Sequence, residues 1–530
     1  MNKNTFLFVA ALFGCWTTAL CQNEFLDATF GDNGVILQYY NGTDPPGNYE
    51  SEFKTMVVQP DGKIITGSDF HQHGPNRRYV INQYHSDGTL NTGFGTNGFV
   101  VSNLNNALGA LQLQSDGKII VCSVEGNYDS SFSYLIRYHA DGTLDDSFGT
   151  EGTVVDAVNT IKTFLIQADG KIIVGKSTQY YGFSSNFKIV KYRSDGMLDN
   201  SFGNNGEVDF SLPQSKVSLE DIRVQNDGKI LVSALVKSDN ADDYSSNILL
   251  VRFEANGSLD STFGNGGSKI FDYNYNDSIK DFLIQADGKI AFLVSNYGTE
   301  AVKGIVRLHP TGSLDETFGV GGMKNIDYPI LSLLSVKQLS NGKLVVAGIY
   351  QTSVNPTPES NASPSAVVVA CYNPNGTLDL SFGQNGYIIT IRENHRVLDD
   401  QLLVQSDGKI LVGVTFSNSW YSTHPGAAVL RYNPTPTLSN PAFEKNTAFS
   451  VYPNPIREMV TLDFSLPAPE KLSVEVYDSG GRKILNVFKN QNFSQGNHSQ
   501  KLYFPETLGN GVYFLKISSS KNTTNIKLIK

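Results

Sequence analysis

Short apolar runs separated by turn residues recur along most of the chain, and residues 152–193 illustrate the pattern. Four strand-like runs follow one another there: GTVVDAV, TFLIQA, KIIVG and FKIVKYR. Asp169-Gly170 joins the second run to the third, and Asp-Gly between apolar runs is a strong hairpin signal because glycine tolerates the positive φ of the turn. The pattern predicts a unit of four short strands.

Two sequence marks show that this unit occurs seven times. One is an Asp-Gly-Lys turn, with Asn for Asp once; its copies begin at Asp61, Asp116, Asp169, Asp227, Asp287, Asn341 and Asp407. The other is a Leu-Asp-x-x-Phe-Gly run; its copies begin at Leu26, Leu90, Leu144, Leu198, Leu259, Leu314 and Leu378. The copy at Leu90 is altered to Leu-Asn-Thr-Gly-Phe-Gly, and a degenerate eighth copy at Leu438 ends the array. Seven units of four strands predict 28 strands.

Radial stacking is the arrangement that best suits these units. A four-stranded unit of roughly 55 residues cannot bury both faces of its sheet alone, whereas stacking around an axis buries them and leaves few open edges. We therefore expect an all-β fold, a seven-bladed β-propeller of four-stranded blades. A linear β-solenoid or two separate sandwiches are alternatives, but short strands with tight hairpins suit blades better.

We expect the repeated residues themselves to have structural roles. We expect Asp and Gly to shape the turns and Phe to plug the space between blades. Calcium binding by an Asp-rich turn such as residues 141–146 is an alternative, but the turn lacks the alternating carboxylates of a dedicated calcium loop.

These marks resemble the delta-60 repeat family. The resemblance covers about four-fifths of the chain, and it is specific because both motifs recur in register seven times. The resemblance implies the propeller fold and little about biochemical function.

The ends of the array suggest how the ring closes. The second to fourth strands of a unit resemble a Kelch-type blade, and the Leu-Asp-x-x-Phe-Gly run would lead into the outermost strand of the same blade. The seventh blade then lacks its outer strand, because the copy at Leu438 leads into a linker. We predict that residues 34–40 (GVILQYY) fill the gap beside residues 429–432, so that the first and last units share a sheet.

The pattern changes at Phe449 to short alternating runs with Gly turns, which predicts a small C-terminal β-sandwich. Its marks are Tyr452-Pro453-Asn454-Pro455, VEVYDSGGRKI, Gly511-Val512-Tyr513-Phe514 and a terminal Lys-Leu-Ile-Lys. The segment resembles the type A C-terminal sorting domain of the type IX (Por) secretion system of Bacteroidota. The resemblance implies entry into the periplasm, export by the type IX machinery, removal of the tail, and release or attachment at the cell surface. An ordinary accessory sandwich is the alternative.

The N-terminus has the pattern of a signal peptide. Lys3 precedes the apolar run FLFVAALFG, and Ala19-Leu20-Cys21 places small residues for cleavage before Gln22. A membrane anchor is the alternative, but the run is well short of about 20 residues; lipidation at Cys15 is disfavoured by the bulky Phe13. We expect a signal peptide over 1–21, the propeller over 22–443, a linker over 434–448 that overlaps the degenerate copy, and the sorting domain over 449–530.

Charge and cysteine content narrow the function classes. The chain has a formal net charge of −10, while residues 449–530 hold ten basic and six acidic residues, so the propeller carries the acidic excess. An acidic body argues against nucleic acid or an anionic membrane as partner, and no later segment is long enough to span a membrane. Cys122 and Cys371 lie in apolar runs and are expected to be buried thiols rather than a disulfide.

No catalytic motif stands out. A nucleophile elbow, a zinc-binding His pair with Glu, a phosphate loop and CxxC are all absent from the sequence. His71-Gln72-His73 has no obvious third ligand, and a carboxylate pair of the glycosidase kind does not stand out among the many acidic residues. We expect no cofactor and no metal.

The composition of the loops between strands suggests a candidate binding site. In a four-stranded blade the uniform Asp-Gly turns share one face, so the variable loops lie on the other. These loops are NYDSSFS (127–133), TQYYGFSS (178–185), SDNADDYSS (238–246), TSVNPTPESNASPS (352–365) and FSNSWYSTHPG (416–426). Aromatic and small polar residues on a rigid scaffold suit recognition of glycans or proteins, although these could equally be solvated loops without a ligand. The candidate ligand contacts are Trp420, Tyr421, Tyr180, Tyr181, Tyr128 and Tyr244.

The leading hypothesis is therefore a secreted or surface-displayed, non-catalytic binding module with a glycan or protein ligand. The alternatives are an extracellular propeller hydrolase or lyase acting on polysaccharide, and a structural surface component. An aromatic platform without a carboxylate cluster would favour binding, whereas converging carboxylates with shifted pKa values would favour an enzyme.

Overall fold

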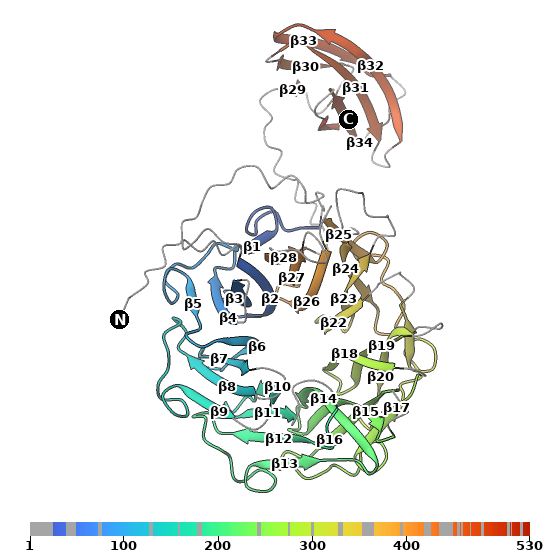
Figure 1. The fold of residues 1–530 in the computed structure, drawn as a ribbon. Coiled ribbons are helices and arrows are strands. Elements are labelled where there is room, and N and C mark those ends of the chain that lie inside the picture. Colours follow the sequence, from blue (N-terminus) through green and yellow to red (C-terminus); the bar gives the residue numbers. More distant parts are fainter. Residues whose placement is uncertain are drawn as a thin grey trace. The chain divides into compact units, whose positions relative to one another are not determined.

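A computed structural model shows the fold of the chain (Figure 1). It describes residues 25–38, 49–72, 77–126, 131–156, 160–177, 183–240, 245–273, 276–297, 302–326, 332–351, 365–392, 396–417, 426–433, 449–452, 456, 459–466, 468–478, 482–505, 509, 511–519 and 523–530. The chain forms two compact units, Met1–Pro436 and Thr437–Lys530, which are taken separately below.

The first unit contains seven four-stranded antiparallel sheets arranged as blades around a common axis (Figure 1). Blade one consists of β2 (Tyr49–Val58), β3 (Ile64–Gln72), β4 (Arg77–Tyr84) and β5 (Phe99–Val101). Blade two consists of β6 (Asn106–Leu113), β7 (Ile119–Gly126), β8 (Ser131–Tyr138) and β9 (Thr153–Asp156). Blade three consists of β10 (Thr160–Ile166), β11 (Ile172–Ser177), β12 (Phe187–Tyr192) and β13 (Glu207–Phe210). The first strand of each blade is the innermost.

The remaining blades repeat this order. Blade four consists of β14 (Ser215–Val224), β15 (Ile230–Ser238), β16 (Asn247–Phe253) and β17 (Ser268–Phe271). Blade five consists of β18 (Asn276–Ile284), β19 (Ile290–Tyr297), β20 (Lys303–Leu308) and β21 (Met323–Asn325). Blade six consists of β22 (Ser332–Gln338), β23 (Leu344–Gln351), β24 (Ser365–Tyr372) and β25 (Tyr387–Arg392). Blade seven consists of β26 (Arg396–Val404), β27 (Ile410–Ser417), β28 (Gly426–Tyr432) and β1 (Val35–Gln38). The predicted all-β, seven-bladed propeller is confirmed.

Blade seven is completed by the N-terminal strand, as predicted. β1 pairs with β28 in antiparallel register, from Val35 opposite Leu430 to Gln38 opposite Ala427. The pairing therefore reaches residues 427–430, slightly earlier than the predicted 429–432, and residues 39–40 lie outside the described part of the chain. Backbone bonds extend the contact, because the Asn433 amide donates to the Phe25 carbonyl at 2.8 Å. Both ends of the array thus belong to one sheet.

The Asp and Phe of the Leu-Asp-x-x-Phe-Gly run contact an Arg near the end of the preceding strand, and we call this inter-blade contact the clasp. In blade two, Arg137 Nε lies 2.8 Å from Asp145 Oδ2, and the Arg137 guanidinium lies 4.7 Å from the ring centroid of Phe148. Arg137 Nη1 also donates a 2.5 Å hydrogen bond to the Ser194 carbonyl of the next unit. The equivalent arginines are Arg252, Arg307 and Arg431. The clasp therefore joins each of these blades to its neighbour.

The phenylalanine of the clasp plugs the space between blades, as expected. Phe148 is fully buried, and Gly196 in the second turn of the next unit lies against it. A Cβ at Gly196 would come within 2.9 Å of the Phe148 ring, and Gly196 has a φ of +86°. Both facts explain why this turn carries glycine.

Three blades replace the arginine of the clasp. The position holds Gln83 in blade one, Lys191 in blade three and Cys371 in blade six. In blade one the aspartate is replaced as well, and Asn91 Nδ2 donates a 2.5 Å hydrogen bond to Gln83 Oε1. A neutral pair therefore satisfies the same position in one blade.

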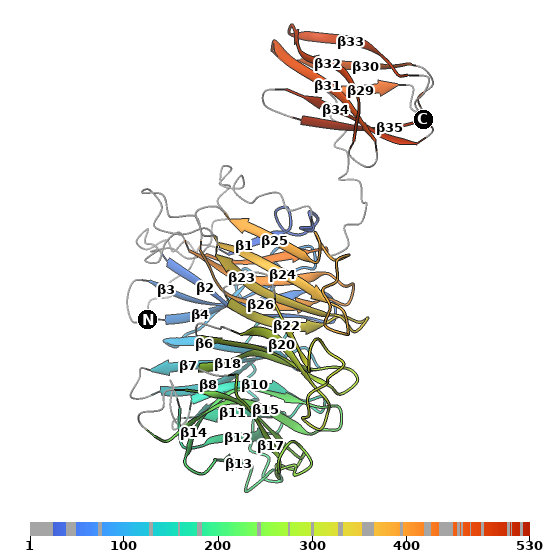
Figure 2. The same cartoon turned by 90° about the vertical axis from the view of Figure 1, so that its right-hand side faces the viewer.

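The two repeated motifs meet on one face of the ring, here called the motif face. The lysine of the Asp-Gly-Lys turn forms an ion pair with the aspartate of the same blade's Leu-Asp-x-x-Phe-Gly run in six blades. The N–O distance ranges from 2.7 Å for Lys343 and Asp379 to 3.3 Å for Lys118 and Asp145. Seen from the side, the strands run from one face of the ring to the other (Figure 2). Connections at the opposite strand ends therefore emerge on the other face.

Apolar side chains fill the spaces between neighbouring blades. Val121 from blade two and Ile65 from blade one belong to one buried cluster, which shows that the core lies between sheets. Cys122 and Cys371 are buried free thiols, as expected. Burial raises the pKa of each thiol to about 12.

The second unit is a β-sandwich, also as predicted. One sheet contains β29 (Phe449–Tyr452), β30 (Met459–Leu466) and β33 (Gly496–Tyr503). The other contains β32 (Lys483–Phe493), β31 (Glu470–Asp478), β34 (Val512–Ser518) and β35 (Thr523–Ile529). Val460 of the first sheet and Leu515 of the second are fully buried in one core. Throughout the described residues, no helix is long and apolar enough to cross a membrane.

Candidate functional site

The face opposite the motif face carries the loops that vary most, and we call it the variable face. Five of its connections leave from the strand pairs β7/β8, β11/β12, β15/β16, β23/β24 and β27/β28. The strand ends that flank them are defined, with Gln351 opposite Ser365 as one example. The candidate contacts Trp420, Tyr421, Tyr180, Tyr181, Tyr128 and Tyr244 lie outside the described residues, so their role stays a prediction.

The predicted sorting residues divide between the described and the remaining parts of the chain. Pro453, Asn454 and Pro455 lie outside the described residues. Tyr452 ends β29, is 51% exposed, and donates a hydrogen bond from its hydroxyl to Asp463.

The other sorting residues, Gly511-Val512-Tyr513, open the strand β34. The Gly511 amide donates to the Lys530 carbonyl at 2.9 Å, and the Lys530 amide donates back at 3.0 Å. Tyr513 is buried, and its hydroxyl donates to the Gly509 carbonyl at 2.9 Å. These residues therefore tie the last residue of the chain into the sheet.

Bulges on the innermost strands form a feature that sequence reasoning missed. Each inner strand shows a register shift against its partner. The shifts lie at Phe53/Thr55, Leu108/Ala110, Ile161/Thr163, Leu219/Asp221, Ile279/Phe282, Leu333/Ser335 and Leu398/Asp400. A bulge leaves a residue unpaired in the ladder and re-aims its side chain. The bulges leave one residue unpaired in six blades and two, Lys280 and Asp281, in blade five, all on the innermost strands.

Three consecutive bulges carry charged residues, here called the axial cluster: Lys162 on β10, Glu220 on β14 and Lys280 on β18. Glu220 and Lys280 are exposed, and Lys162 is half-buried. Neighbouring blades cover both faces of each four-stranded sheet. An exposed side chain on an innermost strand therefore reaches solvent along the ring axis. Figure 1 shows β10, β14 and β18 around the centre of the ring.

The groups of the axial cluster act on one another electrostatically. Surrounding protein reduces the hydration of Glu220 and raises the pKa of its carboxyl, although a hydrogen bond from Ser218 and the charges of Lys162 and Lys280 oppose this. The Ser218 hydroxyl lies 3.0 Å from Glu220 Oε1. Burial lowers the pKa of Lys162, and the Glu220 charge opposes that shift. Glu220 thus stands between two cations on neighbouring blades.

A second set of charges near the axis is structural. Lys337 Nζ lies 2.8 Å from Asp281 Oδ2, and Arg223 Nη2 lies 3.2 Å from Asp281 Oδ1. Arg223 also pairs with Asp221, at 2.5 Å. These contacts link the inner strands of blades four, five and six, so their charges are already matched by one another.

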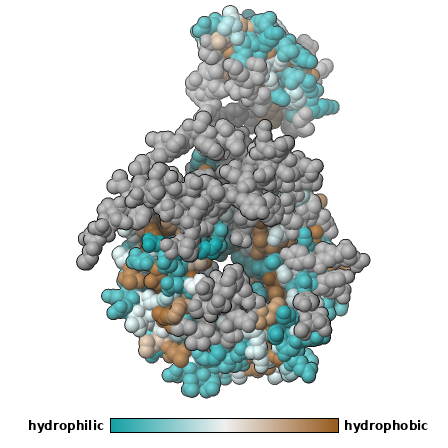
Figure 3. Space-filling view, in the orientation of Figure 1, coloured by the Kyte–Doolittle hydropathy of each residue, from teal (hydrophilic) through white to brown (hydrophobic). Residues whose placement is uncertain are grey.

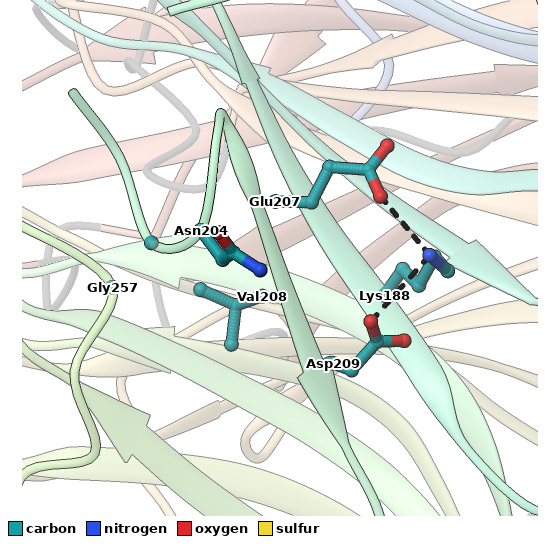
Figure 4. A pocket seen from close by; sticks show the side chains of 7 residues that line it. Lys188, Asn204, Glu207, Val208, Asp209 and Gly257 are labelled. Atoms are coloured by element: carbon teal, nitrogen blue, oxygen red, sulfur yellow. Dashed lines mark hydrogen bonds and ion pairs between the residues drawn. The ribbon is translucent and has the colours of Figure 1, made fainter. Parts of the chain in front are cut away.

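A surface groove of about 540 Å³ lies at the outer rim between blades three and four (Figure 4). Lys188 points between the carboxylates of Glu207 and Asp209, at 3.0 Å and 3.5 Å. Asn204 and Val208 line the same groove. The one cation among its lining residues is engaged by two carboxylates, which favours a structural use of the groove.

Asp277, at the variable-face end of β18, is a buried carboxyl that is 1% exposed. Burial raises its pKa to about 6, the nearby Asp272 adds to the rise, and a hydrogen bond from the Tyr273 amide opposes it. Its Oδ2 accepts that bond at 2.8 Å. By accepting this hydrogen bond, the Asp277 carboxyl stabilises the loop before β18, which is a structural role.

The surface mixes hydrophilic and hydrophobic residues around the propeller (Figure 3). Among the described residues, no three His, Cys, Asp or Glu side chains are grouped so that they could hold a metal ion. His71 is part of β3, while His73 lies outside the described residues.

The fold and its motifs define a class of protein, a β-propeller followed by a C-terminal β-sandwich. The description "Domain of unknown function (DUF5122) beta-propeller" matches residues 59–94, 114–148, 167–202, 225–263, 285–318, 339–382 and 405–435. The description "Secretion system C-terminal sorting domain" matches residues 450–530. The chain is thus a DUF5122 propeller protein with a sorting domain, which confirms the delta-60-like repeats and the Por-type tail. The tail marks it for type IX export, to the medium or the outer-membrane surface.

No curated protein matches the chain. Among solved structures, the polysaccharide lyase Uly1 is 12% identical with a TM-score of 0.44, covering 76% of this chain and 93% of that one. A PL25 ulvan lyase is 9% identical with a TM-score of 0.44, covering 76% and 96%. A Bacteroides caccae protein of unknown function is 12% identical with a TM-score of 0.31, covering 59% and 95%. Likenesses this weak carry no argument about activity.

Proposed function

We propose that the protein is a non-catalytic binding module, displayed on the cell surface or released, that binds a glycan or protein ligand on the variable face. One observation carries the proposal: the repeated motifs are bonded to one another on the motif face, and the long loops leave from the opposite strand ends. A rigid ring that holds diverse loops together on one side is a scaffold suited to recognition.

The aromatic loop residues are the proposed contacts. Trp420, Tyr421, Tyr180, Tyr181, Tyr128 and Tyr244 supply large contact areas with a polar group, which suits sugars and protein surfaces. The same sorting route that exports the chain would bring this face to extracellular ligands.

A glycan array with the exported protein tests the proposal. We expect binding to a limited set of glycans, and loss of that binding in the double variant Trp420→Ala, Tyr421→Ala. The matched control is Asp146→Ala, an exposed residue of the motif face, which should bind as the parent does. Binding that is equally strong in the double variant would contradict the placement of the site. A protein ligand would appear instead as capture of extracellular protein with the same sensitivity to the two substitutions.

The same preparation tests the enzyme alternative, an extracellular hydrolase or lyase acting on polysaccharide. Each glycan that binds is incubated with the protein, and new reducing ends and unsaturated uronates are measured. Turnover of a bound glycan would replace the binding proposal with the enzyme, whereas binding with unchanged chain length supports it.

A further inference from the structure

Asp277 and Asn296 lie opposite each other at the variable-face ends of β18 and β19. Both side chains are buried, with exposed fractions of 1% and 2%. Each residue forms hydrogen bonds to backbone groups outside its own strand. We call these two residues and their bonds the loop hub.

The loop hub joins three connections of the variable face. The Tyr273 amide, between β17 and β18, donates to Asp277 Oδ2 at 2.8 Å, and Asn296 Nδ2 donates to the Tyr273 carbonyl at 2.9 Å. The Asp277 amide donates at 2.8 Å to the carbonyl of Ser246, which precedes β16, and the Ser246 hydroxyl donates back to the Asp277 carbonyl at 3.1 Å. The Val302 amide, just before β20, donates to Asn296 Oδ1 at 2.5 Å. Two buried side chains thus anchor one end of each connection.

Ionisation of Asp277 works against the loop hub. Burial removes water from the carboxylate and the charge of Asp272 repels it, and together they raise the pKa of Asp277 to about 6 against opposing hydrogen bonds from Tyr273 and Asn296. A neutral carboxyl still accepts the hydrogen bond from the Tyr273 amide and carries no such cost. Opening of the hub would return water to the ionised group.

The other titratable groups on blade five leave this cost in place. Lys303 of β20 is opposite Ser295, which is opposite Ser278, so it lies on the other face of the sheet from Asp277. Tyr273 stays neutral, because burial and the Asp277 charge raise its pKa to about 12.

The lysines of blade four that lie towards the variable face or on β17 have partners of their own. These pairs are Lys237 with the ring of Phe183 at 4.7 Å, Lys269 with the ring of Phe271 at 5.8 Å, and Lys216 with the carboxylate of Asp239 at 4.0 Å.

We propose that Asp277 is a protonation switch for the variable face. With its carboxyl protonated, the loop hub holds the three connections together, and with the carboxyl ionised the hub opens. The connection between β15 and β16 includes Tyr244, so the switch acts on a loop that presents a proposed contact. The inference concerns the fold of the propeller and goes beyond the proposed binding function.

Hydrogen exchange of the exported protein tests the switch, with mass spectrometry that resolves single amides. The amides of Tyr273, Asp277 and Val302 report one connection each, and their exchange rates are corrected for the intrinsic effect of pH. We expect protection to fall as pH rises from about 4 to about 6 and to level off above, because the hub loses stability only between the open-state and closed-state pKa values. A pKa raised from 3.8 to about 6 corresponds to a fall of about 100-fold. The Gly288 amide, which donates to the Gln285 carbonyl in a motif-face turn of the same blade, should keep constant protection.

Three variants assign the effect to Asp277. Asp277→Asn keeps an oxygen that accepts the Tyr273 hydrogen bond and cannot ionise, so the three amides should stay protected at every pH. Asp272→Asn removes the repelling charge, so protection should fall less and level off at a lower pH. Asp69→Asn is the matched control, because Asp69 is another buried carboxyl, 1% exposed, that accepts a backbone amide, from Leu108 at 2.6 Å. It should leave the pH dependence of the three amides unchanged.

The outcomes decide the proposal independently of any ligand. Constant protection across the pH range, the same fall in Asp277→Asn as in the parent, or a fall at Tyr273 alone would overturn the switch. Should Asp277→Asn fail to fold, the parent series and Asp272→Asn still decide, since an unchanged levelling pH in Asp272→Asn contradicts the role of the carboxyl. A glycan array without hits would leave the switch standing, and a pH-independent hub would leave the proposed binding function standing.

Discussion

The clasp of blade seven gives a quantitative prediction, because it joins the two ends of the propeller. Asp27 accepts a hydrogen bond from Arg431 Nε at 2.9 Å and forms ion pairs with Arg431 Nη2 at 2.9 Å and Lys409 Nζ at 3.0 Å. Burial alone would raise the pKa of Asp27, but hydrogen bonds from Thr29 and Lys409 and the Arg431 charge lower it to about 2. We expect Asp27→Asn to loosen the closure of the ring.

Two arguments set the size of the effect. A fall of the Asp27 pKa from 3.8 to about 2 corresponds to about 2 kcal/mol of stabilisation of the charged form. Removing one partner of a buried ion pair costs about 3–5 kcal/mol, since the remaining charge is left without compensation. Asp27→Asn should therefore lower the free energy of unfolding by about 2–5 kcal/mol at neutral pH. Arg431→Gln should do the same.

Blade one supplies the matched control for this pair. Its clasp position holds Gln83 and Asn91, which bond at 2.5 Å without any charge. The double variant Asp27→Asn, Arg431→Gln reproduces that pair in blade seven, so its loss of stability should be smaller than the sum of the two single losses. Urea unfolding of the four proteins, followed by tryptophan fluorescence and circular dichroism, measures the cycle.

The same cycle has a pH dependence whose sign follows from the lowered pKa. The stabilisation by Asp27 is complete above its unfolded-state pKa and is lost as pH falls through the folded-state value of about 2. The difference between wild type and Asp27→Asn should therefore be constant at neutral pH and shrink below about pH 4. A strictly additive double variant, or a single variant as stable as wild type, would refute the account of the clasp.

Three further outcomes are expected. Deletion of residues 22–41 should sharply lower the melting temperature, because β1 and the blade-seven clasp are lost together. A deletion protein that melts like the parent would argue against closure of the ring by β1. Asp277→Asn should stabilise the fold above pH 6, because the raised pKa of Asp277, about 6, makes its ionisation unfavourable in the folded state; the gain in melting temperature should vanish as pH falls below about 4, where the carboxyl is protonated in both states. The intact mass of protein from the native host should show a mature N-terminus at Gln22 and an end near residues 434–448, and an exported form that retains Lys530 would speak against removal of the tail.

Much of the propeller could be predicted because its signals are local and repeated. Asp169-Gly170 specifies a tight hairpin by backbone conformation alone, and seven copies in register fix the number of blades. The closure by β1 followed from counting strands, since one blade was left with three. These arguments needed only the order of strands along the chain.

The clasp and the axial cluster were harder to see, because both depend on register between segments far apart. Arg431 follows the pattern of a strand that ends in Arg-Tyr, but its partner Asp27 lies 404 residues away. Lys162 directly precedes the apolar run TFLIQA, where strict alternation assigns it to a sheet face. The bulge between Ile161 and Thr163 changes that assignment, and nothing in the local composition announces it.

Because β1 pairs with β28, the ring closes only when both ends of the propeller array are present. Residues 25–38 are made first, and their partners in β28 and Asn433 are made last among the propeller residues. During synthesis β1 has no strand to pair with, and β28 would keep an open edge in any chain that had lost its N-terminus. A fragment truncated at either end therefore exposes an unpaired strand to proteases and to aggregation. Only an array with both ends present pairs β1 with β28 and covers both strand edges.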